Sequence, residues 1–268
     1  MDDSLIRFYT LGSEADVRLV HGQNVAAHTF PVHAHRSFSL GWVEKGRRII
    51  QTNGKTIYVA AGEGFWLNPN QPHTCRIDEP GGHGYWVVSL RPAYVQGLFE
   101  QATGLTGLPR LAGIKLSDAP FLADLAAWLK SQPDGNEGHF EALLGALFKS
   151  HAGEAAPPAP AHEVWLAATF RQLETCQNEA VLLDELAAAA HVSPFYLHRV
   201  FRKAAGVPPH TYLLHTRIKK SLAILLETDS IAAAAQQLGF ADQSHFTRLF
   251  KRQVGVTPGK FLDTHRKP

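Results

Sequence analysis

A fifteen-residue segment near the C-terminus occurs twice. Residues 199–213 read RVFRKAAGVPPHTYL, and residues 248–262 read RLFKRQVGVTPGKFL. Arg, Phe, Gly, Val, Pro and Leu recur in register at an offset of 49 residues. Repetition at a fixed offset indicates a repeated structural unit. Because two copies are too few for a stacked repeat array, we interpret the repeat as a duplicated functional unit.

The length and charge of the chain favour two domains with different partners. A chain of 268 residues is long enough for two domains that each bury a core. The net charge of +2 is uneven, because the part from Glu163 onward carries +4 and the remainder carries −2. A basic C-terminal part fits a polyanion such as DNA.

The cysteines and the apolar runs predict a soluble protein of the cytoplasm. Cys75 and Cys176 are too few for a disulfide framework, which favours a reducing compartment. The opening residues, Met-Asp-Asp-Ser, do not resemble a signal peptide. Nothing in the chain approaches 18 consecutive apolar residues, so we expect no membrane partner.

The pattern of apolar runs and turn residues in the N-terminal half predicts a small β-sandwich or barrel. Short apolar runs alternate with Gly, Pro and Asn from residue 25 to residue 90, and Asn53-Gly54 predicts a tight hairpin. Apolar residues then recur at helical spacing over 121–129 and 140–148. We expect these two helices to cover an open face of the sheet or to form a dimer surface.

Four side chains in this half have metal-ligand chemistry. In a strand, residues i and i+2 point to the same side, so His33 pairs with His35, and His73 pairs with Cys75. If the two strands are neighbours, the four side chains form an N/S site suited to zinc or a similar divalent metal. The alternative is that the histidines hydrogen-bond a polar organic effector or structural neighbours without a metal.

The same residues resemble the two motifs of a cupin domain. The pattern consists of His33-x-His35, Gly46 and residues 62–73, GEGFWLNPNQPH. Metal-binding cupins carry a Glu four or five residues after the second His, where this chain has Ser39 and Leu40. This departure favours a cupin that holds a small ligand. The segment 67–73 also resembles the sensor domains of AraC-type regulators. The predicted effector contacts are His33, His35, Trp42, Trp66 and His73.

A proline- and alanine-rich segment, residues 152–162, separates the two halves. Its composition is typical of an extended, semi-stiff linker. We therefore predict an effector-binding and dimerisation domain over 1–151 and a DNA-binding domain over 163–268.

All strong patterns after the linker are helical. Ser193-Pro194 is a helix start, because Ser caps free backbone N–H groups and Pro suits the first helical position. Two short helices joined by a turn, the second rich in Arg and His, predict a helix-turn-helix. A long helix over 210–227 follows, and the unit then returns over 231–254. The alternative for periodicity alone is a plain helical bundle with solvated basic faces.

The second copy resembles the signature of the AraC/XylS family of bacterial transcription regulators. The resemblance covers about 100 residues and centres on residues 238–258, LGFADQSHFTRLFKRQVGVTP. It implies two helix-turn-helix units, bridged by a long helix, that enter successive major grooves. The implied base-reading residues are Phe195, His198, Arg199, Gln243, Ser244 and Arg248. Arg202, Lys203, Lys251 and Arg252 would contact phosphates. Arg199 and Arg248 could instead bond carboxylates within the bundle.

We therefore expect a two-domain α+β protein, with a cupin-like barrel followed by two helices and an all-α domain. Its expected function is effector-controlled, sequence-specific regulation of transcription rather than catalysis. The expected partners are double-stranded DNA, a small-molecule effector, RNA polymerase and a second copy of the chain. A metal-dependent cupin enzyme, a metal sensor and a non-specific architectural DNA binder are the competing hypotheses.

Overall fold

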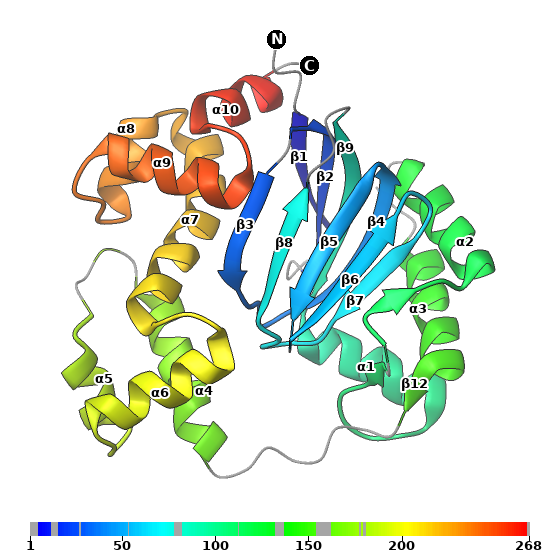
Figure 1. Ribbon diagram of the computed structural model, residues 1–268, viewed down its shortest axis with the longest axis horizontal. Helices are drawn as coiled ribbons and strands as arrows, with labels where there is room; N and C mark the ends of the chain where they lie inside the picture. Colours follow the sequence, from blue (N-terminus) through cyan, green and yellow to red (C-terminus); the bar gives the residue numbers. More distant parts are fainter. Residues whose placement is uncertain are drawn as a thin grey trace. The chain divides into compact units, whose positions relative to one another are not determined.

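The computed structural model describes residues 5–11, 16–26, 28–52, 54–77, 82–111, 113–131, 137–153, 162–176, 178 and 181–266 (Figure 1). The chain divides into two compact units, and each is described here by itself. The first is mainly the β-rich part before the proline-rich segment, and the second is mainly the helical part after it. None of the helices in these ranges is long and apolar enough to span a membrane.

Two antiparallel sheets make up the β-rich part of the chain, and all their strands belong to the first unit except residues 29–33 of β3 and 73–74 of β8. The larger has the strand order β1-β2-β9-β4-β7-β11 and the smaller the order β3-β8-β5-β6. The strands are β1 (Leu5–Leu11), β2 (Val17–Val25), β3 (His28–His33), β4 (Phe38–Lys45), β5 (Arg47–Thr52), β6 (Lys55–Ala60), β7 (Gly64–Leu67), β8 (His73–Ile77), β9 (His83–Leu90) and β11 (Lys115–Leu116). The hairpin predicted at Asn-Gly is present, since Thr52 of β5 pairs with Lys55 of β6. The described strands form separate sheets rather than the closed barrel that the sequence suggested.

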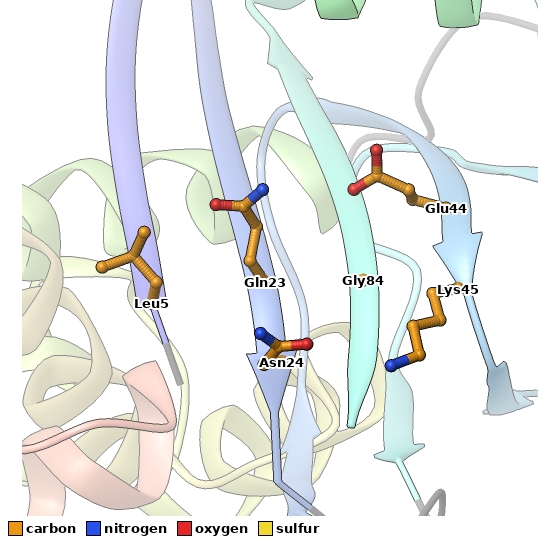
Figure 2. Close-up of a pocket in the computed structure, with 6 residues that line it drawn as sticks. All are labelled: Leu5, Gln23, Asn24, Glu44, Lys45 and Gly84. Atoms are coloured by element: carbon orange, nitrogen blue, oxygen red, sulfur yellow. The ribbon is translucent and has the colours of Figure 1, made fainter. Parts of the chain in front are cut away.

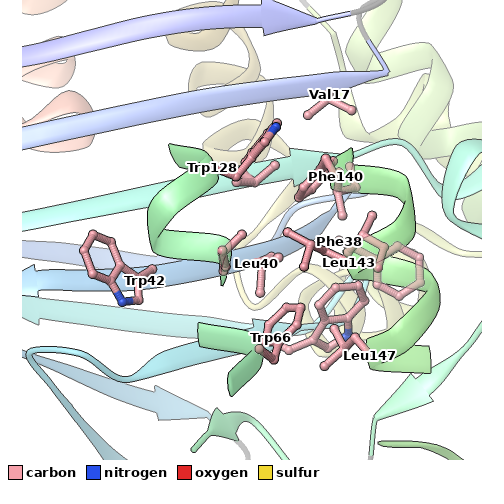
Figure 3. Close-up of a cluster of buried hydrophobic side chains, with 14 of the residues drawn as sticks. Val17, Phe38, Leu40, Trp42, Trp66, Trp128, Phe140, Leu143 and Leu147 are labelled. Carbon is pink, nitrogen blue, oxygen red and sulfur yellow. The ribbon is translucent and has the colours of Figure 1, made fainter. Parts of the chain in front are cut away.

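Three helices cover one face of the six-stranded sheet: α1 (Pro92–Thr103), α2 (Ala119–Lys130) and α3 (Glu137–His151). The two predicted helices correspond to α2 and α3, whereas α1 was not predicted. Figure 3 shows the cluster of apolar side chains between sheet and helices. There the Phe148 ring meets Trp66 of β7 and Phe99 of α1, with centroids 6.0 and 5.8 Å apart.

The predicted linker lies mostly outside the described residues, which omit 154–161. At its start, Ala152–Gly153 forms the short strand β12, which pairs with β10 (Arg110–Leu111). At its end, His162 is the first residue of helix α4. The sequence did not reveal β12, because a two-residue strand carries no periodicity.

The part of the second unit after the proline-rich segment is helical where the structure describes it. It consists of α4 (His162–Thr175), α5 (Leu183–Ala189), α6 (Pro194–Ala205), α7 (Pro209–Thr228), α8 (Ile231–Gln237), α9 (Gln243–Val254) and α10 (Pro258–Arg266). The pairs α5–α6 and α8–α9 are the two predicted helix-turn-helix units, and α7 is the long helix between them. The starts of α5 and α8 are 48 residues apart and those of α6 and α9 are 49 apart. The second turn is therefore one residue longer.

Candidate nucleic-acid interface and effector site

Helix α6 begins at a capped residue and exposes one polar face. The Ser193 hydroxyl accepts a hydrogen bond from the Tyr196 amide at 3.2 Å, and Pro194 occupies the first helical position. Leu197, Phe201 and Ala205 are buried at helical spacing. Because these residues fix the inward face, the side chains between them must point to solvent.

Helix α9 repeats this construction with a stronger cap. The Asp242 carboxylate accepts from the His245 amide at 2.7 Å, and Phe246, Leu249 and Phe250 are buried. A carboxylate at a helix N-terminus satisfies a free N–H group and also complements the helix dipole. The first turn of α9, which carries two of the predicted base-reading residues, is therefore held in place by one side chain.

The predicted DNA-contacting residues lie on the solvent side of these two helices. Phe195 is 78% exposed, and His198 is half-buried. The other members are exposed: Arg199, Arg202, Lys203, Gln243, Ser244, Arg248, Lys251 and Arg252. Within the described ranges, no carboxylate forms an ion pair with Arg199 or Arg248, and Arg199 lies over the Tyr196 ring. The alternative structural role for the two arginines therefore has no ion pair to support it.

Polar side chains that the sequence did not reveal join helix α7 to the end of α4 and to the turn of the second helix-turn-helix unit. The Tyr212 hydroxyl donates to Glu174 of α4 at 2.8 Å, and Lys220 Nζ donates to the Cys176 carbonyl at 3.2 Å. On the other side, Arg217 donates to the Gly239 carbonyl in the second turn at 3.4 Å. These contacts connect the bridging helix to the elements on either side of it.

Three of the four predicted metal ligands lie together at the β3–β8 edge of the smaller sheet. The side-chain nitrogens of His33, His35 and His73 lie within 4.8 Å of one another. The rings of His33 and His73 are 4.3 Å apart. Cys75 is not part of this group of described residues, and burial raises the pKa of its thiol. Three neutral imidazoles are a donor set that suits a divalent transition metal.

The two tryptophans predicted to contact an effector are placed elsewhere. Trp42 and Trp66 lie in the cluster beneath α1–α3, where they are 6% and 1% exposed (Figure 3). The Lys130 ammonium lies 5.1 Å from the Trp42 ring, and Phe38 packs against Trp66. The structure therefore does not group them with the three histidines. Alternation along β4 and β7 explains this, because it turns these side chains toward the helices.

A polar cluster that the sequence did not reveal links the two sheets. Arg48 of β5 is 4% exposed, and its guanidinium carbon lies 4.0 Å from the centroid of the Tyr85 ring on β9 and 5.6 Å from that of Phe65 on β7. His83, two residues before Tyr85, is fully buried. The available signal was the strand β5 itself, where Arg48 lies on the same face as the buried Ile50 and Thr52.

A surface pocket of about 300 Å³ opens at one end of the larger sheet (Figure 2). Its lining consists of Leu5, Gln23, Asn24, Glu44, Lys45 and Gly84. Glu44 also bonds His21 at 3.2 Å, and the His21 ring stacks on Trp86. None of the predicted effector residues lines this pocket.

Comparison with known proteins gives matches over both units. The model of the AraC-like ligand binding domain matches residues 18–152, and that of a helix-turn-helix domain matches residues 186–264. An uncharacterised HTH-type transcriptional regulator of Bacillus subtilis, YbfI, is 29% identical over 81% of each chain. The regulator MtrA of Neisseria gonorrhoeae is 38% identical over 30% of this chain and 27% of its own. An apo structure of ToxT from Vibrio cholerae covers 96% of this chain and 99% of its own, with a TM-score of 0.68 and 13% identity.

Proposed function

Because the chain belongs to the AraC-like family of transcription regulators, with a ligand-binding domain and a helix-turn-helix domain, we propose that one protomer reads two successive major grooves of DNA. The observation that carries this proposal is the repeated geometry of α6 and α9. Each is a twelve-residue helix with a side-chain cap, a buried apolar face and an exposed polar face. A helix of this kind is what a major groove admits.

The bridging helix supports this arrangement by its length. Helix α7 has 20 residues, which corresponds to about 30 Å at 1.5 Å per residue. Successive major grooves on one face of B-DNA lie about 34 Å apart. A helix of this length, hydrogen-bonded to α4 through Tyr212 and to the second turn through Arg217, suits the separation of two recognition helices.

Within each recognition helix we assign two groups of residues. Phe195, His198, Arg199, Gln243, Ser244 and Arg248 would face base edges, because they lie in the first turns or on the exposed central face. Arg and Gln have the donor geometry for guanine and adenine respectively. Arg202, Lys203, Lys251 and Arg252 follow in the last turns and would contact phosphates, which sets affinity but not sequence.

Two matched variants of α9 test this division. Arg248→Ala should relax discrimination at one base pair by about 1–3 kcal/mol, while Lys251→Ala should weaken binding to all sequences alike. Both residues are exposed, so neither change should disturb the fold. The measurement is fluorescence anisotropy at fixed salt, on a site selected from random DNA and on its point variants. Equal loss on every sequence for both variants would reject the base-reading role of Arg248.

For the first unit we propose that the effector binds between the two sheets, and that His33, His35 and His73 contribute to that site. The support is the convergence of the three imidazoles and the burial of His73. Trp42 and Trp66 would respond to the effector indirectly, since they pack between the sheet and α1–α3. A change in that packing would connect effector binding to DNA binding.

The three histidines also support a second candidate function, a metal sensor. Replacement of His73 by Ala removes the most buried of the three nitrogen donors. If the site binds metal, Co²⁺ should give a visible absorption band with the wild-type chain and a much weaker one with this variant. A band of equal strength in both would place the ion elsewhere, and no band at all would favour the organic effector.

We extend the proposal to the setting in which the regulator works. The protein would act on chromosomal DNA in the cytoplasm, as a homodimer and in contact with RNA polymerase. Sedimentation of the full chain with and without its selected DNA site tests the homodimer directly, because a monomer on DNA would contradict it.

A further inference from the structure

The buried guanidinium of Arg48 is held between two aromatic rings. Tyr85 and Phe65 belong to the larger sheet and Arg48 to the smaller one. Two glycines make room for these rings. A Cβ on Gly22 would lie 2.4 Å from the Tyr85 ring, and a Cβ on Gly41 would lie 2.0 Å from the Phe65 ring. The position of the cation is therefore fixed by four residues on β2, β4, β7 and β9.

The charge of Arg48 has no negative partner in the part of the chain that the structure describes. Among the described residues, no carboxylate lies within ion-pair distance of the Arg48 guanidinium. Burial raises the pKa of the Tyr85 hydroxyl and of the Cys75 thiol, so both stay neutral near pH 7. Burial and the charge of Arg48 lower the pKa of His83 to about 3, so its imidazole is neutral as well. An uncompensated buried charge is costly, so an anion bound at Arg48 would stabilise the folded unit.

The unsatisfied N–H groups of Arg48 indicate what kind of anion would fit beside it. Arg48 Nε and Nη2 are shielded from solvent and have no acceptor among the described residues. These two nitrogens form one edge of the guanidinium, the edge that holds a carboxylate by two parallel hydrogen bonds. The ring nitrogens of His83 are also shielded from solvent, and the Lys45 backbone is a hydrogen-bonding neighbour of this imidazole. Buried polar groups of this kind are normally satisfied, so each unsatisfied one needs an explanation.

We propose that the effector carries a carboxylate and that Arg48 binds it through Nε and Nη2, with His83 as a neutral hydrogen-bonding neighbour. This inference rests on the proposed effector-binding function of the first unit and adds the chemical class of the ligand. A single flat cation between two rings suits a planar monoanion better than a dianionic phosphate. A water molecule would satisfy one N–H group but would leave the charge uncompensated.

The test measures the melting temperature of the full chain with pairs of ligands that differ only in charge. The probes are acetate, benzoate, octanoate and oleate, each compared with its methyl ester at equal ionic strength. Ligands that bind the folded state raise the melting temperature in proportion to occupancy. We expect at least one acid to stabilise the protein and its ester to have no effect. The proposal is overturned if none of the four acids stabilises the wild-type chain.

Two variants test whether Arg48 is the residue that binds the carboxylate. Arg48→Met should weaken binding of the active acid at least ~30-fold and should not lower the melting temperature without ligand, because it removes a buried charge. Arg47→Met is the control, since Arg47 is the exposed neighbour whose guanidinium lies over Tyr58; it should leave acid binding unchanged.

Two outcomes would contradict the proposal that Arg48 binds the effector carboxylate. If Arg48→Met unfolds the protein, or keeps the acid response, Arg48 is a structural clamp and the inference is wrong. If Arg48→Met gives either of these results but the wild-type chain still binds DNA specifically, the proposed DNA-binding function is unaffected.

Discussion

Removal of the Asp242 cap should loosen the first turn of the second recognition helix. Asp242→Ala deletes the acceptor of the 2.7 Å hydrogen bond from the His245 amide. Loss of a helix cap costs about 0.5–2 kcal/mol, and loss of a carboxylate near the helix dipole adds about 0.3–1 kcal/mol. A local loss of 1.4 kcal/mol would raise the exchange rate of that amide about tenfold. Gln243 and Ser244 lie in the same turn, so DNA discrimination should fall with it.

The assay is hydrogen exchange of the full chain, read by mass spectrometry on peptides that cover α9. Asp242→Asn serves as the matched control, because Asn caps helices about as well as Asp but carries no charge. We expect the Asn variant to differ from wild type by the dipole contribution alone. Peptides from α6, which has its own cap at Ser193, provide the internal reference.

Three results are distinguishable. Faster exchange in α9 for Ala but little change for Asn supports the cap. Equal acceleration for Ala and Asn would assign the stabilisation to charge instead. Unchanged exchange in both variants would refute the reasoning, because the 2.7 Å contact would then contribute nothing to the helix. Specific DNA binding, measured on the same samples, should follow the exchange rate of α9 and not that of α6.

Two further predictions concern the helical unit. Gly239→Ala should lower the free energy of unfolding by at least about 1 kcal/mol. The reason is that Gly239 has a φ of +66° and a Cβ there would lie 2.6 Å from the Asn178 carbonyl oxygen. An unchanged midpoint in urea denaturation would contradict this. Burial, with the charges of Lys219 and Arg252, lowers the pKa of His215 to about 4 from 6.5. The unfolded chain then binds the extra proton, so stability should be fully present above pH 6.5 and fall as the pH drops toward 4. His215→Leu should make that fall less steep in urea denaturations across the pH series; an identical slope would show that His215 is not the group responsible.

Sequence reasoning worked best where periodicity and capping act together. The repeated segment led to α6 and α9, and Ser193-Pro194 marks the start of α6 as expected. The one-residue difference between the two turns also follows from the sequence, because the offsets of the paired helices differ by one. Helix α10 was missed, although residues 258–262 at its start repeat residues 209–213 at the start of α7.

In the first unit, the sequence indicated residue types but not sheet faces. Three of the four residues predicted to converge, His33, His35 and His73, lie together, whereas Cys75 is not in that group although it is two residues from His73 along β8. Trp42 and Trp66 were grouped with them, although which side of a strand faces the other sheet depends on helices far along the chain. Arg48 was missed for the same reason, since a basic residue in a strand is usually on a solvated face.

Gly22 and Gly41 limit how the first unit can change its specificity. Each keeps an aromatic ring in place by having no side chain, and neither is among the residues that would bond a ligand. Residues around a bound molecule can be exchanged one at a time, with gradual effects on its affinity. A single added methyl group at either glycine would instead displace Tyr85 or Phe65 and release the cation between them. Regulators that no longer respond to the effector can therefore arise from substitutions at residues that contact neither ligand nor DNA.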